Sequence, residues 1–257
     1  MPLLVKIILA SLIGGLFSLV GGFALLARAS WVKRFSIHLV SFAIGALLAT
    51  AFLDLLPESL ELAEEGGLID PYSLFIWALF GVVLFFVLER LILHFHPHHH
   101  EDTEEHHHPT PTLLLIGDSV HNFIDGCVIA ASFIADPGLG ILATAAVAAH
   151  EIPQEIGDFS VMLTHGWSRS RVMWANVFSS LASLVGAIIV FVMRDALEPL
   201  LPQLLALTSG IFIYIAAADL IPDISKDAPR DKSWHIFALM FLGIAAVWLL
   251  GRYLEGR

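Results

Sequence analysis

Long apolar runs constrain what this chain can fold into more than any other feature of its sequence. A helix needs roughly 20 mostly apolar residues to cross the hydrocarbon core of a bilayer, and eight runs of about that length occur. They cover approximately residues 3–26, 37–60, 72–95, 112–135, 139–164, 171–193, 202–223 and 233–254. Because lipid offers the backbone no hydrogen-bond partner, each run is expected to be a helix. The sequence therefore predicts an all-α integral membrane protein, with eight transmembrane helices in a single domain over residues 1–257.

The composition excludes several other classes of protein. Hydrophobic residues make up 57% of the chain and charged residues 14%, whereas a soluble domain has about 25% charged residues. The formal net charge of -11 gives no reason to expect a nucleic-acid partner. The single cysteine, Cys127, excludes an internal disulfide and a cysteine-rich zinc module. The first run is too long for the apolar core of a cleaved signal peptide, so we expect it to be a retained span.

Lysine and arginine are unevenly distributed between the connections, and this distribution predicts the orientation in the membrane. The connections after runs one, three, five and seven contain nine of them: Arg28, Lys33, Arg34, Arg90, Arg169, Arg171, Lys226, Arg230 and Lys232. The opposite side receives four: Lys6, Arg194, Arg252 and Arg257. Since positive residues concentrate in cytoplasmic loops, both termini are expected outside the cytoplasm, which agrees with an even number of spans.

Two of the runs carry the same short motif. The second run ends in Asp54-Leu-Leu-Pro57-Glu58, and the seventh ends in Asp219-Leu-Ile-Pro222-Asp223. The predicted topology gives these two runs opposite directions across the membrane. Inverted repeats of this kind are common in secondary transporters, whose substrate site lies near the bilayer midplane. We therefore predict an inverted repeat, and the alternative is a chance similarity between two span ends.

Ionisable and amide side chains interrupt the fourth and fifth runs near their centres. The fourth run contains His121, Asn122 and Asp125, and the fifth contains His150, Glu151, Gln154 and Glu155. An ionisable residue in hydrocarbon costs a few kcal/mol or more, so such residues are expected to have a function or a partner.

Helical spacing sorts these residues into two neighbouring sets of ligands, provided that the two helices are adjacent and antiparallel. The first set is His121, Asp125, His150 and Gln154, and the second is Asn122, Asp125 and Glu151, with Gln154 as a further candidate. Glu155, also a candidate metal ligand, lies in the same helical row as Glu151. Nitrogen and oxygen ligands without a thiolate suit Zn²⁺, Fe²⁺, Mn²⁺ or Cd²⁺. Pro153 lacks an N–H, so it predicts a kink beside these ligands.

The two motifs resemble the signature of the ZIP divalent metal transporters. They read His-Asn-x-x-Asp-Gly at residues 121–126 and His-Glu-x-Pro-x-Glu-x-Gly-Asp at residues 150–158. The resemblance implies uptake of a divalent cation into the cytoplasm through a binuclear site, in a 3+2+3 inverted-repeat bundle that forms dimers. Zn²⁺ is the first expectation, with Fe²⁺, Mn²⁺ and Cd²⁺ as alternatives. The zinc-importing branch usually has a histidine where this chain has Gln154, so broader selectivity or lower affinity is expected.

Residues 94–110 form a connection rich in histidine and acid, which the topology places in the cytoplasm. Its histidines are His94, His96, His98, His99, His100, His106, His107 and His108. Such a segment is too polar to pack into a core, and its imidazoles and carboxylates can bind metal loosely. We interpret it as an accessory segment that receives or senses metal, and the alternative is a solvated linker.

Rival functions stay open from the sequence alone. Zinc proteases use His-Glu-x-x-His, and Gln154 breaks that motif. His121, Asp125 and His150 could still hold a zinc ion, so an intramembrane zinc metallohydrolase is the alternative. A proton-coupled carrier and a receptor are further alternatives. No G-x-x-x-x-G-K-[ST] loop occurs, which predicts transport that is not driven by ATP. We expect a transporter rather than an enzyme, with no cofactor besides the transported cation, in the cell membrane.

Overall fold

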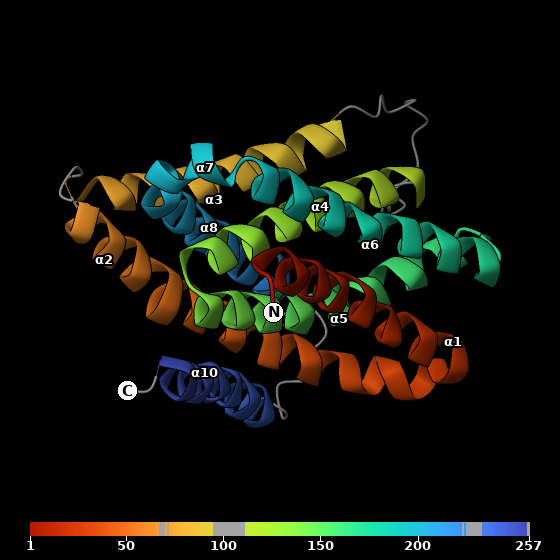
Figure 1. Ribbon diagram of the computed structural model, residues 1–257. Coiled ribbons are helices and arrows are strands. Elements are labelled where there is room, and N and C mark those ends of the chain that lie inside the picture. The colour runs from red at the N-terminus through yellow and green to blue at the C-terminus, as the bar shows by residue number, and fades with distance from the viewer. Residues whose placement is uncertain (67–69, 71, 95–110, 223, 225–232, 256–257) are drawn as a thin grey trace.

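The computed structural model describes the whole chain except residues 67–69, 71, 95–110, 223, 225–232 and 256–257. The described residues form helices and no strand (Figure 1). Most are α-helices: α1 (Leu3–Ala49), α2 (Leu56–Gly66), α3 (Tyr72–His94), α4 (Pro111–Ala135), α5 (Pro137–Thr164), α6 (Arg169–Val192), α7 (Arg194–Leu197), α8 (Leu201–Tyr214) and α10 (Ser233–Glu255). Two segments are π-helices, η1 (Thr50–Leu55) and η3 (Ile215–Leu220), and η2 (Glu198–Leu200) is a 3₁₀ turn. The histidine-rich segment predicted at 94–110 lies outside the described residues, apart from His94.

Seven stretches are long and apolar enough to cross a membrane. They are Leu3–Ala27, Ser36–Gly66, Tyr72–Leu91, Leu114–Ala135, Arg169–Val192, Arg194–Leu220 and Trp234–Leu254. Each coincides with a predicted span, so the multi-pass helical membrane protein is confirmed. The eighth predicted span, at 139–164, is α5 in the structure, a helix of 28 residues. Its ionisable and amide side chains lower its hydropathy below that of the other seven.

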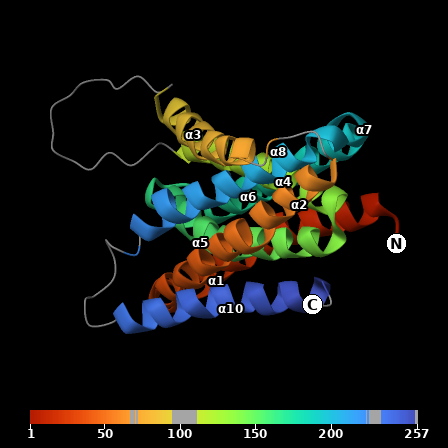
Figure 2. The same ribbon diagram turned by 90° about the vertical axis from the view of Figure 1, so that its left-hand side faces the viewer.

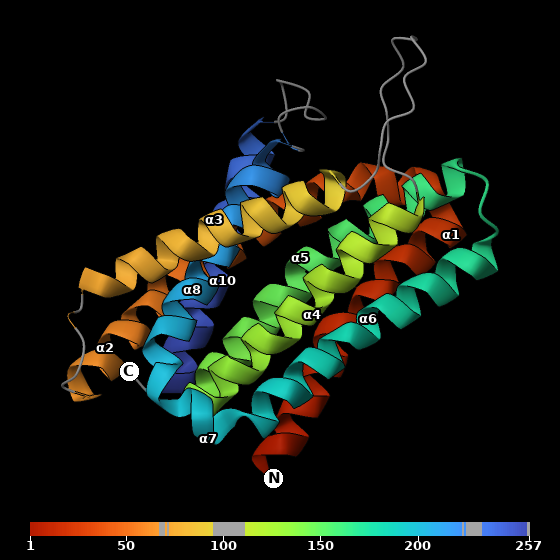
Figure 3. The same cartoon turned by 90° about the horizontal axis from the view of Figure 1, so that it is seen from above.

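The element α1 contains the first two of these stretches. Figures 1 and 3 show its first half running to one end of the molecule and its second half returning. The first half packs along α5, and the second half packs against α10. Figure 2 shows α10 on one side of the bundle next to α1, while α3 lies on the far side against α8.

The two π-helices occur at the two copies of the short motif. Asp54 is the fifth residue of η1, and Asp219 is the fifth residue of η3. In both segments the next N–H donates to the carbonyl five residues earlier, from Leu56 to Ala51 and from Ile221 to Ala216. A proline follows in each copy, and a proline cannot donate to the regular α-helical ladder. The wider π turn is a way to absorb that break.

Glycines on both partners allow three pairs of helices to approach closely. The pairs are Gly45 with Gly243 between α1 and α10, Gly81 with Gly210 between α3 and α8, and Gly126 with Gly186 between α4 and α6. A Cβ placed on Gly126 would lie 1.8 Å from the carbonyl oxygen of Ser183. Small residues at helix crossings are the usual way for membrane helices to pack.

A one-residue joint makes α4 and α5 antiparallel neighbours (Figure 3). The Asp136 carboxylate accepts hydrogen bonds from the N–H groups of Gly138 at 2.7 Å and Leu139 at 3.0 Å. Pro137 occupies the first turn of α5, where its missing N–H costs nothing. An aspartate cap followed by proline is a strong helix start, so the hairpin is set locally by the sequence. The side-by-side arrangement predicted for these two helices is confirmed.

Candidate metal site between α4 and α5

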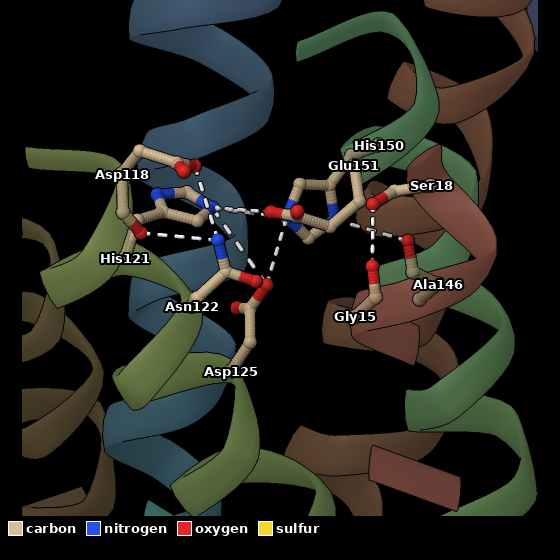
Figure 4. A network of polar contacts seen from close by, with 9 residues as sticks. All are labelled: Gly15, Ser18, Asp118, His121, Asn122, Asp125, Ala146, His150 and Glu151. Carbon is tan, nitrogen blue, oxygen red and sulfur yellow. Dashed lines mark hydrogen bonds and ion pairs between the residues drawn. The ribbon is translucent and has the colours of Figure 1, made fainter. Parts of the chain in front are cut away.

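Four ionisable side chains from α4 and α5 converge in the interior of the bundle (Figure 4). They are His121 and Asp125 from α4 and His150 and Glu151 from α5. All four residues are buried, and none is more than 8% exposed. The two Nε2 atoms of the histidines lie 3.1 Å apart. Predicted partners on different helices therefore meet at one point.

The distances between these four donors match the shape of a zinc site. The Nε2 of His121 lies 3.7 Å from Asp125 Oδ2 and 3.4 Å from Glu151 Oε1. The Nε2 of His150 lies 3.3 Å from Asp125 Oδ2 and 3.7 Å from Glu151 Oε1. A tetrahedral zinc site with bonds of about 2.0–2.1 Å has ligands about 3.3–3.4 Å from one another. The five distances bracket that value, so the four donors need only small shifts to surround one cation.

One hydrogen bond decides which nitrogen of His150 faces the other donors. Its Nδ1 lies 3.0 Å from the carbonyl oxygen of Ala146. A carbonyl only accepts, so Nδ1 carries the hydrogen and Nε2 presents a lone pair. In the short contact between the two rings, His121 Nε2 is then the donor, and a bound cation would replace that hydrogen. Metal-binding histidines commonly use the second nitrogen in this way.

Aromatic rings from other helices cover the two imidazoles. Phe85 of α3 packs edge-on against His121 with ring centroids 5.4 Å apart. Phe212 of α8 packs edge-on against His150, with ring centroids 6.2 Å apart. These contacts restrict ring rotation, so the imidazole orientation depends on α3 and α8 as well as on the helices that carry the rings.

A second group of donors lies directly beside the first. Carboxylate oxygens of Asp118, Glu151 and Glu155 lie within 4.8 Å of one another. These residues are buried as well, at 4%, 0% and 0% exposure. Glu151 belongs to both groups, so the two groups are continuous.

Several carboxylate oxygens at the site accept no hydrogen bond. Both carboxylate oxygens of Asp125, of Glu151 and of Glu155 are buried without a hydrogen-bond partner. Buried polar atoms are nearly always paired, because an unpaired one forfeits its hydration without compensation. A cation is a partner that carboxylates and neutral imidazoles of this arrangement can share.

Five of the seven predicted ligands lie in the two groups of donors, and the other two are Asn122 and Gln154. His121, Asp125, His150 and Glu151 come together, and Glu155 joins the neighbouring group. Asn122 is buried, and its Nδ2 donates to Asp118 Oδ1 at 3.0 Å. Gln154 is half-buried on α5, one turn beyond His150. The ligand roles of these seven residues stay predictions.

The sequence analysis missed one residue of the site and predicted a kink at another. Asp118 was not predicted, although its position four residues before Asn122 placed it on the same face of the helix. Near Pro153, α5 is one uninterrupted helix from Pro137 to Thr164. The helix continues through the proline, and the kink predicted there stays a prediction.

The fold and these donors together define a class: a multi-pass helical membrane protein whose interior gathers nitrogen and oxygen atoms of the kind that bind divalent metals. The chain belongs to the ZIP zinc transporter family, since the family's sequence model matches residues 3–113 and 110–251. The matched residues include every member of both donor groups.

Relatives of this chain are named as zinc transporters. Zinc transporter ZIP13 of Pongo abelii is 31% identical over 227 residues, which is 85% of this chain and 67% of that protein. Human Zinc transporter ZIP13 is 27% identical over 265 residues, covering 85% of this chain and 71% of that protein. Human Zinc transporter ZIP4 is 32% identical over 139 residues, covering 54% of this chain and 21% of that protein.

Proposed function

We propose that the chain moves divalent metal cations, Zn²⁺ above all, across the membrane into the cytoplasm through the site between α4 and α5. The observation that carries this proposal is the meeting of two imidazoles and two carboxylates in the buried interior, at tetrahedral spacing. Asp125 and Glu151 carry two negative charges when ionised, which balance one divalent cation. Fe²⁺, Mn²⁺ and Cd²⁺ suit the same donors and are alternative substrates.

The arrangement of donors favours transport over hydrolysis. A catalytic zinc keeps three protein ligands and one open position for water. Here four protein donors surround the point where a cation would sit, which leaves that position filled. The broken His-Glu-x-x-His motif supports the same conclusion. We therefore place the intramembrane metallohydrolase second, and we propose that the protein is not an enzyme and that transport does not use ATP.

We further propose eight spans in a 3+2+3 inverted repeat, with α5 as the fifth span and both termini outside the cytoplasm. Helix packing supports this arrangement. The first half of α1 packs on α5, and α6 makes the corresponding contact with α4. The second half of α1 packs on α10, and α8 makes the corresponding contact with α3. Gly45 and Gly210 each stand nine residues before the acid of the π-helix, Asp54 and Asp219 respectively. Both glycines lie in close helix crossings. Matching residues in matching contacts are what an inverted repeat produces.

Uptake of Zn²⁺ into proteoliposomes tests the proposed function. We expect the wild-type protein to fill vesicles that contain a zinc-sensitive dye, and a hydrolase would have no need to do so. Asp125→Asn and His150→Gln are expected to slow uptake by more than tenfold, since even residues that only orient metal ligands typically contribute about 10–100-fold. The control is Asp195→Asn, whose side chain is 85% exposed on α7. Uptake that is equal in all four proteins would refute the site.

The cell membrane as the location and the homodimer as the assembly stay predictions. Fractionation of cells that express the tagged chain would test the location. Light scattering on the purified protein would test the dimer, and a mass of one chain plus its detergent would contradict it.

A further inference from the structure

We propose that Tyr214 and Glu89 form a hydrogen-bonded clamp, which fixes the orientation of one imidazole of the metal site. The clamp holds Phe85 in contact with His121, and that ring contact positions the imidazole. Glu89 and Phe85 belong to α3 and Tyr214 to α8, so the clamp joins two helices outside the pair that carries the donors. The inference deepens the proposed function: it rests on that function for the effect on transport, but not for the effect on metal binding.

The two imidazoles of the site are oriented in different ways. The Nδ1 of His150 donates to the Ala146 carbonyl oxygen at 3.0 Å, and metal-binding histidines usually have such a second hydrogen bond. Within the part of the chain that the structure describes, no group forms a hydrogen bond with the Nδ1 of His121, and only its Nε2 makes polar contacts. The orientation of the His121 ring therefore depends on the rings packed against it.

Phe85 is the ring that packs on His121 from outside the group of donors. The two centroids lie 5.4 Å apart in an edge-on arrangement, which is a favourable geometry for an aromatic pair. Phe85 is itself buried. The torsion that turns an imidazole about its Cβ–Cγ bond has only a broad preference of its own. A displaced Phe85 would therefore allow the His121 ring to turn away from the other donors.

Two glycines bring Phe85 and Tyr214 together. Gly81 and Gly210 lie at the close crossing of α3 and α8, and a Cβ on Gly210 would lie 1.9 Å from the Ala78 carbonyl oxygen. Phe85 stands four residues after the first glycine, and Tyr214 stands four after the second. Each ring therefore lies on the helix face that its glycine presents to the other helix. The two ring centroids are 5.7 Å apart.

Glu89 holds the Tyr214 ring in place. The Tyr214 hydroxyl donates to Glu89 Oε2 at 2.5 Å, a length typical of a hydrogen bond to an ionised carboxylate. Glu89 lies within the apolar stretch Tyr72–Leu91, where a carboxylate is expected to have a function or a partner. It stands one turn after Phe85, so one face of α3 supplies both the ring that contacts the imidazole and the acceptor that fixes the tyrosine.

Equilibrium dialysis of the purified full chain with Zn²⁺ tests the clamp, on the tight Zn²⁺ equivalent that His150→Gln removes. Tyr214→Phe keeps the ring and removes the hydroxyl. We expect it to weaken this equivalent by about tenfold, the lower end of the 10–100-fold that groups orienting metal ligands contribute. The matched control is Tyr253→Phe on α10, whose side chain is 82% exposed. Residues 94–110 are the same in every protein, so any metal that they bind cancels in the comparison.

The two rings that cover the imidazoles provide a second comparison. Phe85→Leu is expected to weaken Zn²⁺ binding more than Phe212→Leu, because the His150 ring keeps its hydrogen bond to the Ala146 carbonyl when Phe212 is shortened. A role in packing alone predicts the reverse order, since Phe212 is the more deeply buried ring. If Phe85→Leu does not fold, Phe85→Met carries the same measurement.

Glu89→Gln keeps an oxygen that can accept from the Tyr214 hydroxyl, so it is expected to bind Zn²⁺ more tightly than Glu89→Leu does. Equal Zn²⁺ affinity in Tyr214→Phe and Tyr253→Phe would overturn the clamp, even if the first variant unfolds at a lower temperature. Uptake by wild-type vesicles separates the two proposals. Uptake without a difference in affinity removes only the clamp, and a difference in affinity without uptake removes only transport.

Discussion

Glu151 is the residue on which both groups of donors depend. Its carboxylate lies 3.4 Å from His121 Nε2 and also belongs to the group with Asp118 and Glu155. We predict that Glu151→Gln weakens binding of Zn²⁺ and of Mn²⁺ together, because one neutral amide replaces a carboxylate that belongs to both groups of donors. Asp125→Asn, the matched control, is expected to weaken mainly the Zn²⁺ site. Dialysis with each metal measures both effects, and a loss confined to one metal in Glu151→Gln would contradict the shared role.

Gln154 is the residue at which this chain departs from the zinc-importing pattern. It is half-buried on α5, one turn beyond His150. An imidazole is a better ligand for Zn²⁺ than a neutral amide oxygen. We predict that Gln154→His raises the ratio of Zn²⁺ to Mn²⁺ uptake when the two metals compete. An unchanged ratio, in a variant that still transports, would mean that Gln154 does not contact the cation.

The sequence predicts which residues share a helix face better than it predicts their partners across helices. The four-residue spacing brings His121 next to Asp125, as expected. Across the interface, Glu151, which the sequence analysis assigned to the second set of ligands, joins the two imidazoles and Asp125 in one group of donors. The rotation of α5 about its axis decides this, and that rotation depends on packing against α1 and α4. Helical periodicity contains no information about that packing.

At the scale of the helices, the crossing of α4 and α6 fixes the position of the site. Gly126 follows Asp125 directly, and a Cβ there would lie 1.8 Å from the Ser183 carbonyl oxygen. We predict that Gly126→Ala destabilises the protein by about 1–3 kcal/mol, the usual cost of overpacking. The control is Gly157→Ala on α5, where a Cβ would meet nothing within 4 Å. Thermal unfolding in nanodiscs compares them, and equal melting temperatures would contradict the close contact.

The π-helices show what a span prediction leaves out. Hydropathy located runs two and seven, and the repeated acid and proline marked their ends. The change from α to π hydrogen bonding at Thr50–Leu55 and Ile215–Leu220 adds no apolar residue and removes none. The difference between an α-helix and a π-helix lies in which carbonyl oxygen accepts from each N–H group, so composition cannot show it. The prolines at 57 and 222 were the available signal, because each removes a donor from the ladder.

For the whole molecule, helix pairing is consistent with the proposed inverted repeat of two related halves. The pairs α1–α5 and α6–α4 correspond, and so do α1–α10 and α8–α3. Both donor groups lie on α4 and α5, which contact helices of both halves. A site held between two related halves can be opened to either side when one half tilts against the other. The proposed repeat would connect the buried donors to alternating access, and it requires α5 to cross the membrane.

Cysteine labelling decides whether α5 crosses. In a Cys127→Ser background, Glu65→Cys places a thiol on the exposed end of α2, and His165→Cys places one just after α5, where the side chain is also exposed. With eight spans, a maleimide that cannot cross membranes labels position 65 from outside intact cells, because that end lies outside the cytoplasm. Position 165 is labelled only after permeabilisation. If α5 does not cross, position 165 stays on the side of the membrane where α4 ends. That is also the side of position 65, so both positions would be labelled from outside intact cells.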